Sequence, residues 1–369
     1  MGAALVLFGI LLVLVMAWEA FETVVLPRTV SRRFGVTTLY FAGVWQVTSL
    51  MNRLLGKRPV AREALMAVAG PLSLILLMVV WSAGIMLGFA LIQFGLGTPM
   101  SGGVHDLGIY LYVSAATFFT LGYGDIVALS GAGRTISMIE AGVGFGMLAL
   151  VISYIPVLYQ AFSARERMSL LLDARAGSPP VADELLATYG DDLDGLRALF
   201  AEFERWGSTL LETYLSYPVL TMYRSQHEQL SWIASLTCIC DSCALVQVAY
   251  LEDSERMKNL QRQARLTYAM LRHLVVDVAY IAAKGPINPP QPRMNAERRK
   301  KLVDDLRAAG APVCTTDESW NRLDELRGNY EPYVYGLAQG LFLEMPPWTR
   351  TLDQRASWET TAWDKEKHF

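Results

Sequence analysis

The chain has 369 residues, of which 53% are hydrophobic and 18% are charged, a composition unusual for a soluble protein of this length. Its net charge of −3 gives no sign of a nucleic-acid partner. Four histidines, without a nucleophile motif or a P-loop, argue against an enzyme. Because the apolar residues are gathered in long runs, we expect an all-α integral membrane protein.

The first apolar run, "MGAALVLFGILLVLVMAWEAF", predicts a transmembrane helix within residues 1–26. It has no basic region before it and no small-residue cleavage site, so we interpret it as a retained span and not as a removed signal peptide. Residues 27–63 follow with one acid, Glu63, and seven basic residues: Arg28, Arg32, Arg33, Arg53, Lys57, Arg58 and Arg62. Basic loops stay in the cytoplasm, which would leave the N-terminus outside.

Within this basic loop, residues 36–55 predict an amphipathic helix. Apolar residues recur at spacings of three and four, namely Val36, Tyr40, Val44, Val47, Met51 and Leu54, while Thr37, Thr48 and Asn52 lie elsewhere. The polar face and the basic flanks favour a helix at the cytoplasmic interface, in contact with membrane lipid. A further membrane crossing is the alternative.

Two longer apolar runs predict an outer helix over residues 64–96 and an inner helix over 134–162. Between them, residues 108–119 predict a helix too short to cross a bilayer, followed by "TLGYGD" at 120–125. A short helix before a glycine-rich segment indicates a re-entrant loop. The preceding loop has no Lys or Arg, whereas "SARER" follows the inner helix, so the re-entrant loop should enter from outside.

The glycine-rich segment predicts an ion-binding site made of backbone. Its expected ligands for a weakly hydrated cation are the Thr120 hydroxyl and the carbonyl oxygens of Thr120, Leu121, Gly122 and Tyr123. Gly122 and Gly124 permit the alternating dihedrals that aim successive carbonyl groups the same way. Asp125 would then supply a negative charge where the segment meets water.

These residues resemble the selectivity filter of the potassium channels, since "TLGYGD" differs from that family's Thr-Val-Gly-Tyr-Gly-Asp in one aliphatic residue. The likeness to bacterial channels with one pore loop covers roughly Ala64 to Glu166. It implies a homotetramer in which four copies of Thr120 to Gly124 surround a pore and replace the hydration shell of potassium. Potassium ions in the filter are the only cofactor implied.

The resemblance also has departures near the filter. Phe119 replaces a threonine, Tyr112 and Val113 replace two tryptophans, and Ala116 stands where some members carry a buried glutamate. These differences concern conductance and inactivation more than selectivity.

Three residues of the predicted inner helix are candidates for gating. Gly144 falls where the family often has a hinge, and Pro156 can place a kink, although Gly144 would equally suit close packing against the pore helix. Glu140 is the one carboxylate in the span and lies on the same helix face as Gly144, so it should approach Ser114 or Thr117 behind the filter. Either its protonation alters open probability, or it is a hydrogen-bonded carboxyl with a packing role.

Residues 165–369 predict a helical cytosolic domain without a nucleotide-binding turn. The apolar segment 227–250 carries Asp241 in its middle, which favours a buried bundle helix over a further span. Cys238, Cys240 and Cys243 lack zinc-finger spacing to His227 and are expected to be reduced thiols. "GDDLDG", residues 190–195, should be an acidic helix cap and not a calcium loop.

The sequence therefore predicts a subunit of a potassium-selective, multi-pass channel in a cell membrane, taken to be the bacterial inner membrane, with the N-terminus outside and the C-terminal domain in the cytoplasm. No span has Arg or Lys at every third position, which argues against voltage gating. A weakly selective cation channel and a non-conducting membrane anchor for a signalling domain are the alternatives. Regulation is expected through the cytosolic helical domain, with an unknown ligand or protein as its partner, or through bending of the inner helix. The sequence does not indicate the stimulus.

Overall fold

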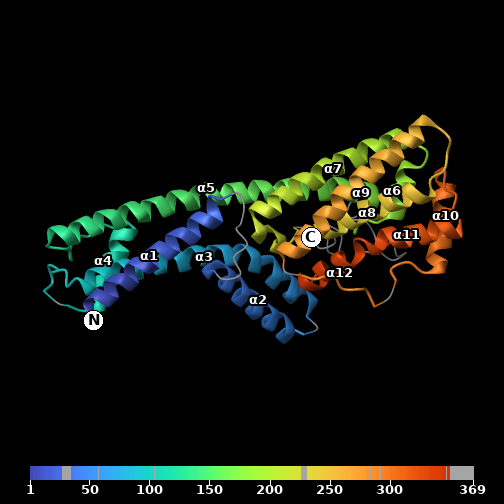
Figure 1. The fold of residues 1–369 in the computed structure, drawn as a ribbon. Helices are drawn as coiled ribbons and strands as arrows, with labels where there is room; N and C mark the ends of the chain where they lie inside the picture. Colours follow the sequence, from blue (N-terminus) through green and yellow to red (C-terminus); the bar gives the residue numbers. More distant parts are fainter. Residues whose placement is uncertain are drawn as a thin grey trace, which may run out of the picture. The chain divides into compact units, whose positions relative to one another are not determined.

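The computed structural model describes residues 1–26, 35–56, 58–103, 105–225, 231–282, 284–290, 292–345 and 347–349. Arg28, Arg32, Arg33, Lys57 and His227 lie outside these residues. Within the described ranges the regular structure is helical, and the extended pairing consists of two isolated β-bridges, so the expected all-α fold is confirmed (Figure 1). The chain forms two compact units, Met1–Tyr159 and Gln160–Phe369.

The first unit contains α1 (Gly2–Val24), α2 (Val36–Leu54), α3 (Pro59–Gly95), α4 (Leu107–Phe118) and the first part of α5 (Gly131–Ala176). By length and composition, α1, α3 and α5 could each cross a membrane, whereas α4 is shorter and α2 is not among the candidates. The predicted short pore helix is therefore present as α4.

The bounds of two helices differ from the prediction by more than one residue. α3 begins at Pro59 and not at residue 64, and α5 runs from Gly131 to Ala176 in place of 134–162. Apolar runs mark where a helix can face lipid, but a helix can continue through charged residues that favour helical backbone, such as Arg165 and Glu166. Proline at the first helical position also suits the start of α3. The boundary between the units consequently falls inside α5, five residues before the predicted 165.

Paired glycines bring α1 and α3 into close antiparallel contact. A Cβ atom at Gly9 would lie 2.6 Å from the Gly88 carbonyl oxygen, and one at Gly88 would lie 2.9 Å from the Gly9 carbonyl oxygen. Gly2 and Gly95 form the same relationship, at 2.6 and 2.7 Å. Glycine lets two helix backbones approach to this degree. The N-terminal helix is therefore an integral part of the first unit.

α2 packs against the first half of α3 with polar residues inward. Thr48 and Asn52 are buried, and the Asn52 side-chain oxygen accepts a hydrogen bond from Arg62 Nε at 2.8 Å. The outward side chains include the apolar Leu39, Val47, Leu50 and Leu54. The helix was predicted correctly, but the assignment of Thr48 and Asn52 to a water-facing side was wrong. A buried polar group is tolerated when it has a partner, which Arg62 supplies to Asn52.

The start of α2 is tied to the end of α1. The Glu19 carboxylate accepts the backbone N–H groups of Val36 and Thr37 at 3.1 and 3.0 Å, which satisfies two donors at the N-terminus of α2. Farther along, the Tyr40 hydroxyl donates to the Ser73 carbonyl at 2.6 Å. These contacts place α1 and α2 one after the other along α3.

The second unit is a helical bundle around α8 (Trp232–Ala249). Its other helices are α6 (Ala182–Tyr189), α7 (Leu193–Ser216), the short 3-10 helix η1 (Pro218–Met222), α9 (Glu255–Ile281), α10 (Ala296–Ala308), α11 (Asp317–Gly328) and α12 (Glu331–Gly340). α8 is long and apolar enough for a membrane span, but 89% of that stretch is covered by the rest of the protein. We therefore treat α8 as the buried bundle helix that the sequence predicted.

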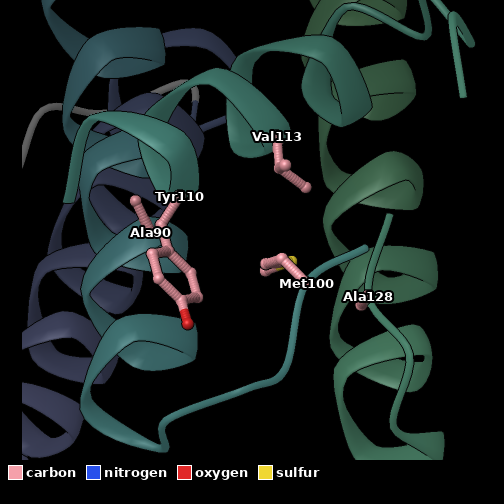
Figure 2. Packing of buried hydrophobic residues seen from close by; sticks show 5 residues of the cluster. All are labelled: Ala90, Met100, Tyr110, Val113 and Ala128. Atoms are coloured by element: carbon pink, nitrogen blue, oxygen red, sulfur yellow. The ribbon is translucent and has the colours of Figure 1, made fainter. Parts of the chain in front are cut away.

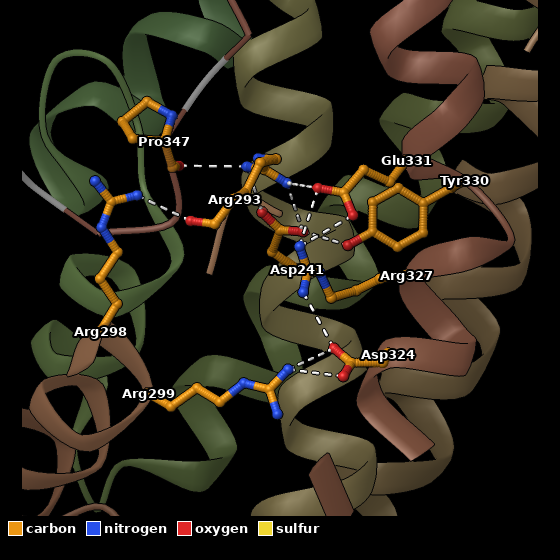
Figure 3. Close-up of polar contacts among 9 residues, drawn as sticks. All are labelled: Asp241, Arg293, Arg298, Arg299, Asp324, Arg327, Tyr330, Glu331 and Pro347. Atoms are coloured by element: carbon orange, nitrogen blue, oxygen red, sulfur yellow. Dashed lines mark hydrogen bonds and ion pairs between the residues drawn. The ribbon is translucent and has the colours of Figure 1, made fainter. Parts of the chain in front are cut away.

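Figure 3 shows a buried ionic network that fixes α8 in this bundle. Asp241 on α8 pairs with Arg293 at 2.9 Å and accepts a hydrogen bond from the Tyr330 hydroxyl. Glu331 pairs with Arg293 at 3.4 Å and with Arg327 at 3.0 Å. The polar residue that argued against a membrane crossing is thus compensated by charges of its own unit.

Two smaller expectations also concern this unit. Asp192 accepts the Gly195 N–H at 2.9 Å at the start of α7, so "GDDLDG" does provide a helix cap. Cys238, Cys240 and Cys243 are buried along α8 as free thiols.

Candidate functional site

The predicted pore loop, residues 119–125, begins where α4 ends. Asp106 caps the start of α4 by accepting the Gly108 N–H at 2.9 Å, and the helix ends at Phe118. Beyond it, Thr120 N donates to the Thr117 carbonyl at 3.0 Å and Leu121 N donates to the Ala116 carbonyl at 2.8 Å. From Gly122 to Gly124, no backbone N–H donates to another backbone carbonyl of the described chain. The loop is therefore anchored at its start and open beyond it.

Alternate residues of the loop have left-handed backbone conformations. The φ angles are +54° at Thr120, +67° at Gly122 and +72° at Gly124. The alternation predicted for the two glycines is thus present. Thr120 was not expected to join it, since a β-branched residue at positive φ is strained by roughly 1–3 kcal/mol. Such outliers cluster at functional sites.

A single chain leaves this loop uncovered. Every residue from Phe119 to Asp125 is exposed, and Tyr123 retains 68% of its accessible surface. The carbonyl groups that were predicted to bind an ion therefore belong to an exposed, irregular backbone.

A small apolar cluster holds the loop from behind. Figure 2 shows its buried members, which come from α3, α4 and the segments before and after the loop: Ala90, Met100, Tyr110, Val113 and Ala128. The Tyr110 hydroxyl donates to the Thr98 carbonyl at 2.6 Å. Met100 and Ala128 also form an isolated antiparallel bridge. The chain entering α4 and the chain leaving the loop are thereby joined.

The carboxylate at the end of the loop is held by α4. The Tyr112 hydroxyl lies 3.0 and 2.8 Å from the two carboxylate oxygens of Asp125. The backbone carbonyl of Asp125 in turn accepts a hydrogen bond from the Ser101 hydroxyl at 3.4 Å. Tyr112, one of the departures from the potassium-channel pattern, therefore supplies a donor to the mouth of the loop.

One face of α5 lies against α4, directly behind the loop. Glu140 is buried and forms a hydrogen bond with Ser114, as predicted. One turn later, a Cβ at Gly144 would collide with the Phe118 carbonyl oxygen, so the close packing considered for Gly144 is present. α5 continues as one helix through Gly144 and Pro156. The gating roles of these three residues stay predictions.

The role of Arg165 was not predicted from the sequence, in which this residue was interpreted as part of a basic flank. Arg165 is buried in the second unit, where it donates to the Leu220 and Tyr223 carbonyls at 3.1 and 3.0 Å and pairs with Glu166 at 2.9 Å. Its guanidinium also lies 4.8 Å from the centre of the Phe162 ring. An arginine just after an apolar run has the same sequence signature whether it faces water or a buried pocket of carbonyls.

Comparison with known proteins bears on the first unit. A family model described as an ion channel matches residues 74–160, a stretch that holds most of α3, the whole pore loop and the first part of α5. Searches of curated proteins and of solved structures gave no match to the chain. The chain is thus a multi-pass membrane protein that is similar, over its pore loop and the two flanking helices, to ion channels.

Proposed function

We propose that the chain is one subunit of a potassium-selective channel, in which the Thr120 hydroxyl and the carbonyl groups of residues 120–123 bind dehydrated potassium. The observation that carries the proposal is the left-handed backbone at Thr120, Gly122 and Gly124. In an extended segment successive carbonyls point to opposite sides, and alternating conformations turn them to one side. The choice of potassium rests on the "TLGYGD" motif and not on the family model, which supports an ion channel in general.

A homotetramer is proposed for two reasons. Irregular backbone at membrane depth must face protein or water, and residues 119–125 are not covered by protein within one chain. The filter that the motif resembles is built from four such loops. Around that axis, Asp125 would concentrate cations at the outer mouth, with Tyr112 fixing its carboxylate.

The proposed topology places the N-terminus and the pore loop outside the cytoplasm, in the bacterial inner membrane. Its support is the contact of Gly2 with Gly95, which puts the start of α1 beside the end of α3. The basic residues of 27–63 would then face the cytoplasm, with α2 near membrane lipid. The second unit would be cytosolic, where a ligand or protein could regulate the channel.

Gating is proposed to involve α5 and not the membrane voltage. Gly144 and Pro156 are the points at which α5 can bend, and Glu140 lies one turn before Gly144 on the face that supports the pore loop. The stimulus is left open.

Reconstitution tests the function. Purified protein in liposomes should take up potassium in strong preference to sodium, and Gly122→Ala should abolish this uptake while the oligomer persists, because alanine resists positive φ. Gly43→Ala is the matched control, since a Cβ at Gly43 meets no atom of the described residues within 4 Å. Equal potassium and sodium uptake would indicate the weakly selective channel. An absence of flux from the unmutated protein would favour the non-conducting anchor.

A further inference from the structure

A chain of buried polar contacts joins three helices behind the pore loop. Ser114 on α4 is 1% exposed and Glu140 on α5 is fully buried. Ser114 Oγ lies 2.8 Å from the Met86 carbonyl oxygen on α3 and forms a hydrogen bond with Oε1 of Glu140. One serine hydroxyl thus contacts two of the candidate spanning helices of the first unit, α3 and α5.

The number of protons determines the direction of these bonds. A serine hydroxyl has one proton to donate, whereas a backbone carbonyl and an ionised carboxylate have none. Two separate hydrogen bonds among three oxygens require two protons, since a single hydroxyl proton would have to be shared between the two acceptors. If Ser114 donates to Met86, then the proton between Ser114 and Glu140 belongs to the carboxyl group. An ionised Glu140 would leave one of the two contacts as a pair of oxygens without a proton between them.

The surroundings of Glu140 fit a neutral acid. None of the ion pairs formed within the described part of the chain includes Glu140. Its second oxygen, Oε2, has no hydrogen-bond partner among those residues. Met86, Ser114 and Phe118, which approach this part of α5 from α3 and α4, carry no charge. A buried carboxylate without a cation costs far more free energy than a neutral acid with one unpaired carbonyl oxygen.

We propose that Glu140 is a positioning residue that acts as a neutral carboxylic acid, donating to Ser114 while Ser114 donates to the Met86 carbonyl. The chain of donors fixes α4 to α3 and α5 one turn before α4 ends at Phe118. Gly144 holds the next turn through the Phe118 backbone. The pore loop then starts from a helix end that is held at two successive turns, and what residue 140 must supply is a proton donor and not a charge.

Infrared spectroscopy tests the protonation state without reference to conduction. At neutral pH, the difference spectrum between the unmutated protein and Glu140→Gln should contain the carbonyl stretch of a carboxylic acid. The same difference for Glu63→Gln, an exposed acid of the first unit, should contain carboxylate bands. Carboxylate bands from Glu140 would overturn the proposal, and they would do so whether or not the protein conducts potassium.

A pair of variants tests the positioning role. The flux measurements in this test rest on the proposed function, whereas the measurements of thermal stability do not. Glu140→Gln keeps a donor and should retain potassium flux and thermal stability within about twofold and a few degrees of the unmutated protein. Glu140→Met has similar length but no donor, and its flux should fall by about tenfold or more. Equal losses in both variants, or no loss in Glu140→Met, would overturn the role. If the unmutated protein does not conduct, or if Glu140→Met does not fold, the positioning role is tested by the melting temperature of Glu140→Gln. A value within a few degrees of that of the unmutated protein supports the role, and a larger loss overturns it.

Discussion

The hydroxyl of Tyr112 and the carboxylate of Asp125 are joined by a shared hydrogen bond, with distances of 3.0 and 2.8 Å to the two acceptor oxygens. This contact links α4 to the far end of the predicted pore loop. In the proposed channel, Tyr112→Phe should shorten the mean open time by roughly two- to tenfold, because one charge-assisted hydrogen bond is lost. Single-channel recording measures this. Asp125→Asn keeps one acceptor oxygen for Tyr112, so unchanged gating in Tyr112→Phe together with altered gating in Asp125→Asn would assign the effect to charge alone.

The glycine pairs between α1 and α3 predict where bulk is not tolerated. Gly9→Leu and Gly88→Leu should each destabilise the protein by about 1–3 kcal/mol, since a side chain would have to displace the opposing backbone. Thermal unfolding in detergent measures the loss. Gly43→Leu serves as the control, because a Cβ at this position of α2 lies more than 4 Å from every atom that the structure describes. Equal melting temperatures for all three variants would refute the close packing of α1 on α3.

The basic segment before α3 is expected to be cytoplasmic throughout. Thr38 and Gln46 are exposed positions on α2, so cysteines placed there would be available to reagents. In a background without the native cysteines, a membrane-impermeant thiol reagent should label Thr38→Cys and Gln46→Cys only in inverted vesicles or opened cells. Labelling from outside intact cells would show that α2 crosses or faces away from the cytoplasm.

The thiols of α8 should be inert in the folded protein. Burial raises the pKa of Cys238, Cys240 and Cys243 well above the ordinary thiol value, so little thiolate is available to react. Cys314 is exposed. Mass spectrometry after brief alkylation at pH 8 should find Cys314 modified at least about tenfold faster than the other three, and a denaturant should remove the difference. Comparable rates without denaturant would show that α8 is not the core of this bundle.

Arg165 should be essential to the second unit. Arg165→Met leaves two carbonyl groups and Glu166 without their buried cation and should destabilise the protein by about 3–5 kcal/mol. Arg167→Met changes an exposed neighbour and should have an effect of less than about 0.5 kcal/mol. Denaturant unfolding of the full chain compares them, and a small effect at both positions would remove Arg165 from the structural role assigned to it.

Local patterns in the sequence predicted the parts of the pore loop that depend on residue type. The glycines at 122 and 124 indicate positive φ because other residues resist it, and both angles are observed. Helical periodicity placed Glu140 and Gly144 on one face, and the contact with Ser114 follows from it. The length of the apolar runs located α1, α3 and α5, although charged residues extend α3 and α5 beyond them.

Contacts between residues that are far apart in the sequence produce no local sequence pattern from which they could be predicted. Glu19 caps a helix that starts 17 residues later, and Asp241 pairs with Arg293 across 52 residues. The apolar neighbours of Asp241 indicate that it is buried, but nothing in the sequence identifies Arg293 as its partner or Val36 as the partner of Glu19. The positive φ of Thr120 could also not be predicted from the sequence, because the loop imposes this angle against the conformational preference of threonine. Tertiary structure decides these features, and a single sequence does not display them.

The cap that Glu19 forms on α2 also sets a length scale for the membrane. From Gly2 to Trp18 the helix α1 has no charged side chain, and at 1.5 Å per residue this stretch measures about 26 Å, against a hydrocarbon core of about 30 Å. Because the Glu19 carboxylate is hydrogen-bonded to the backbone of α2, it cannot shift along the membrane normal to stay at the lipid–water interface when the bilayer is thicker. The first unit is therefore matched to bilayers of ordinary hydrophobic thickness, and in a markedly thicker bilayer the lipid would have to thin around it.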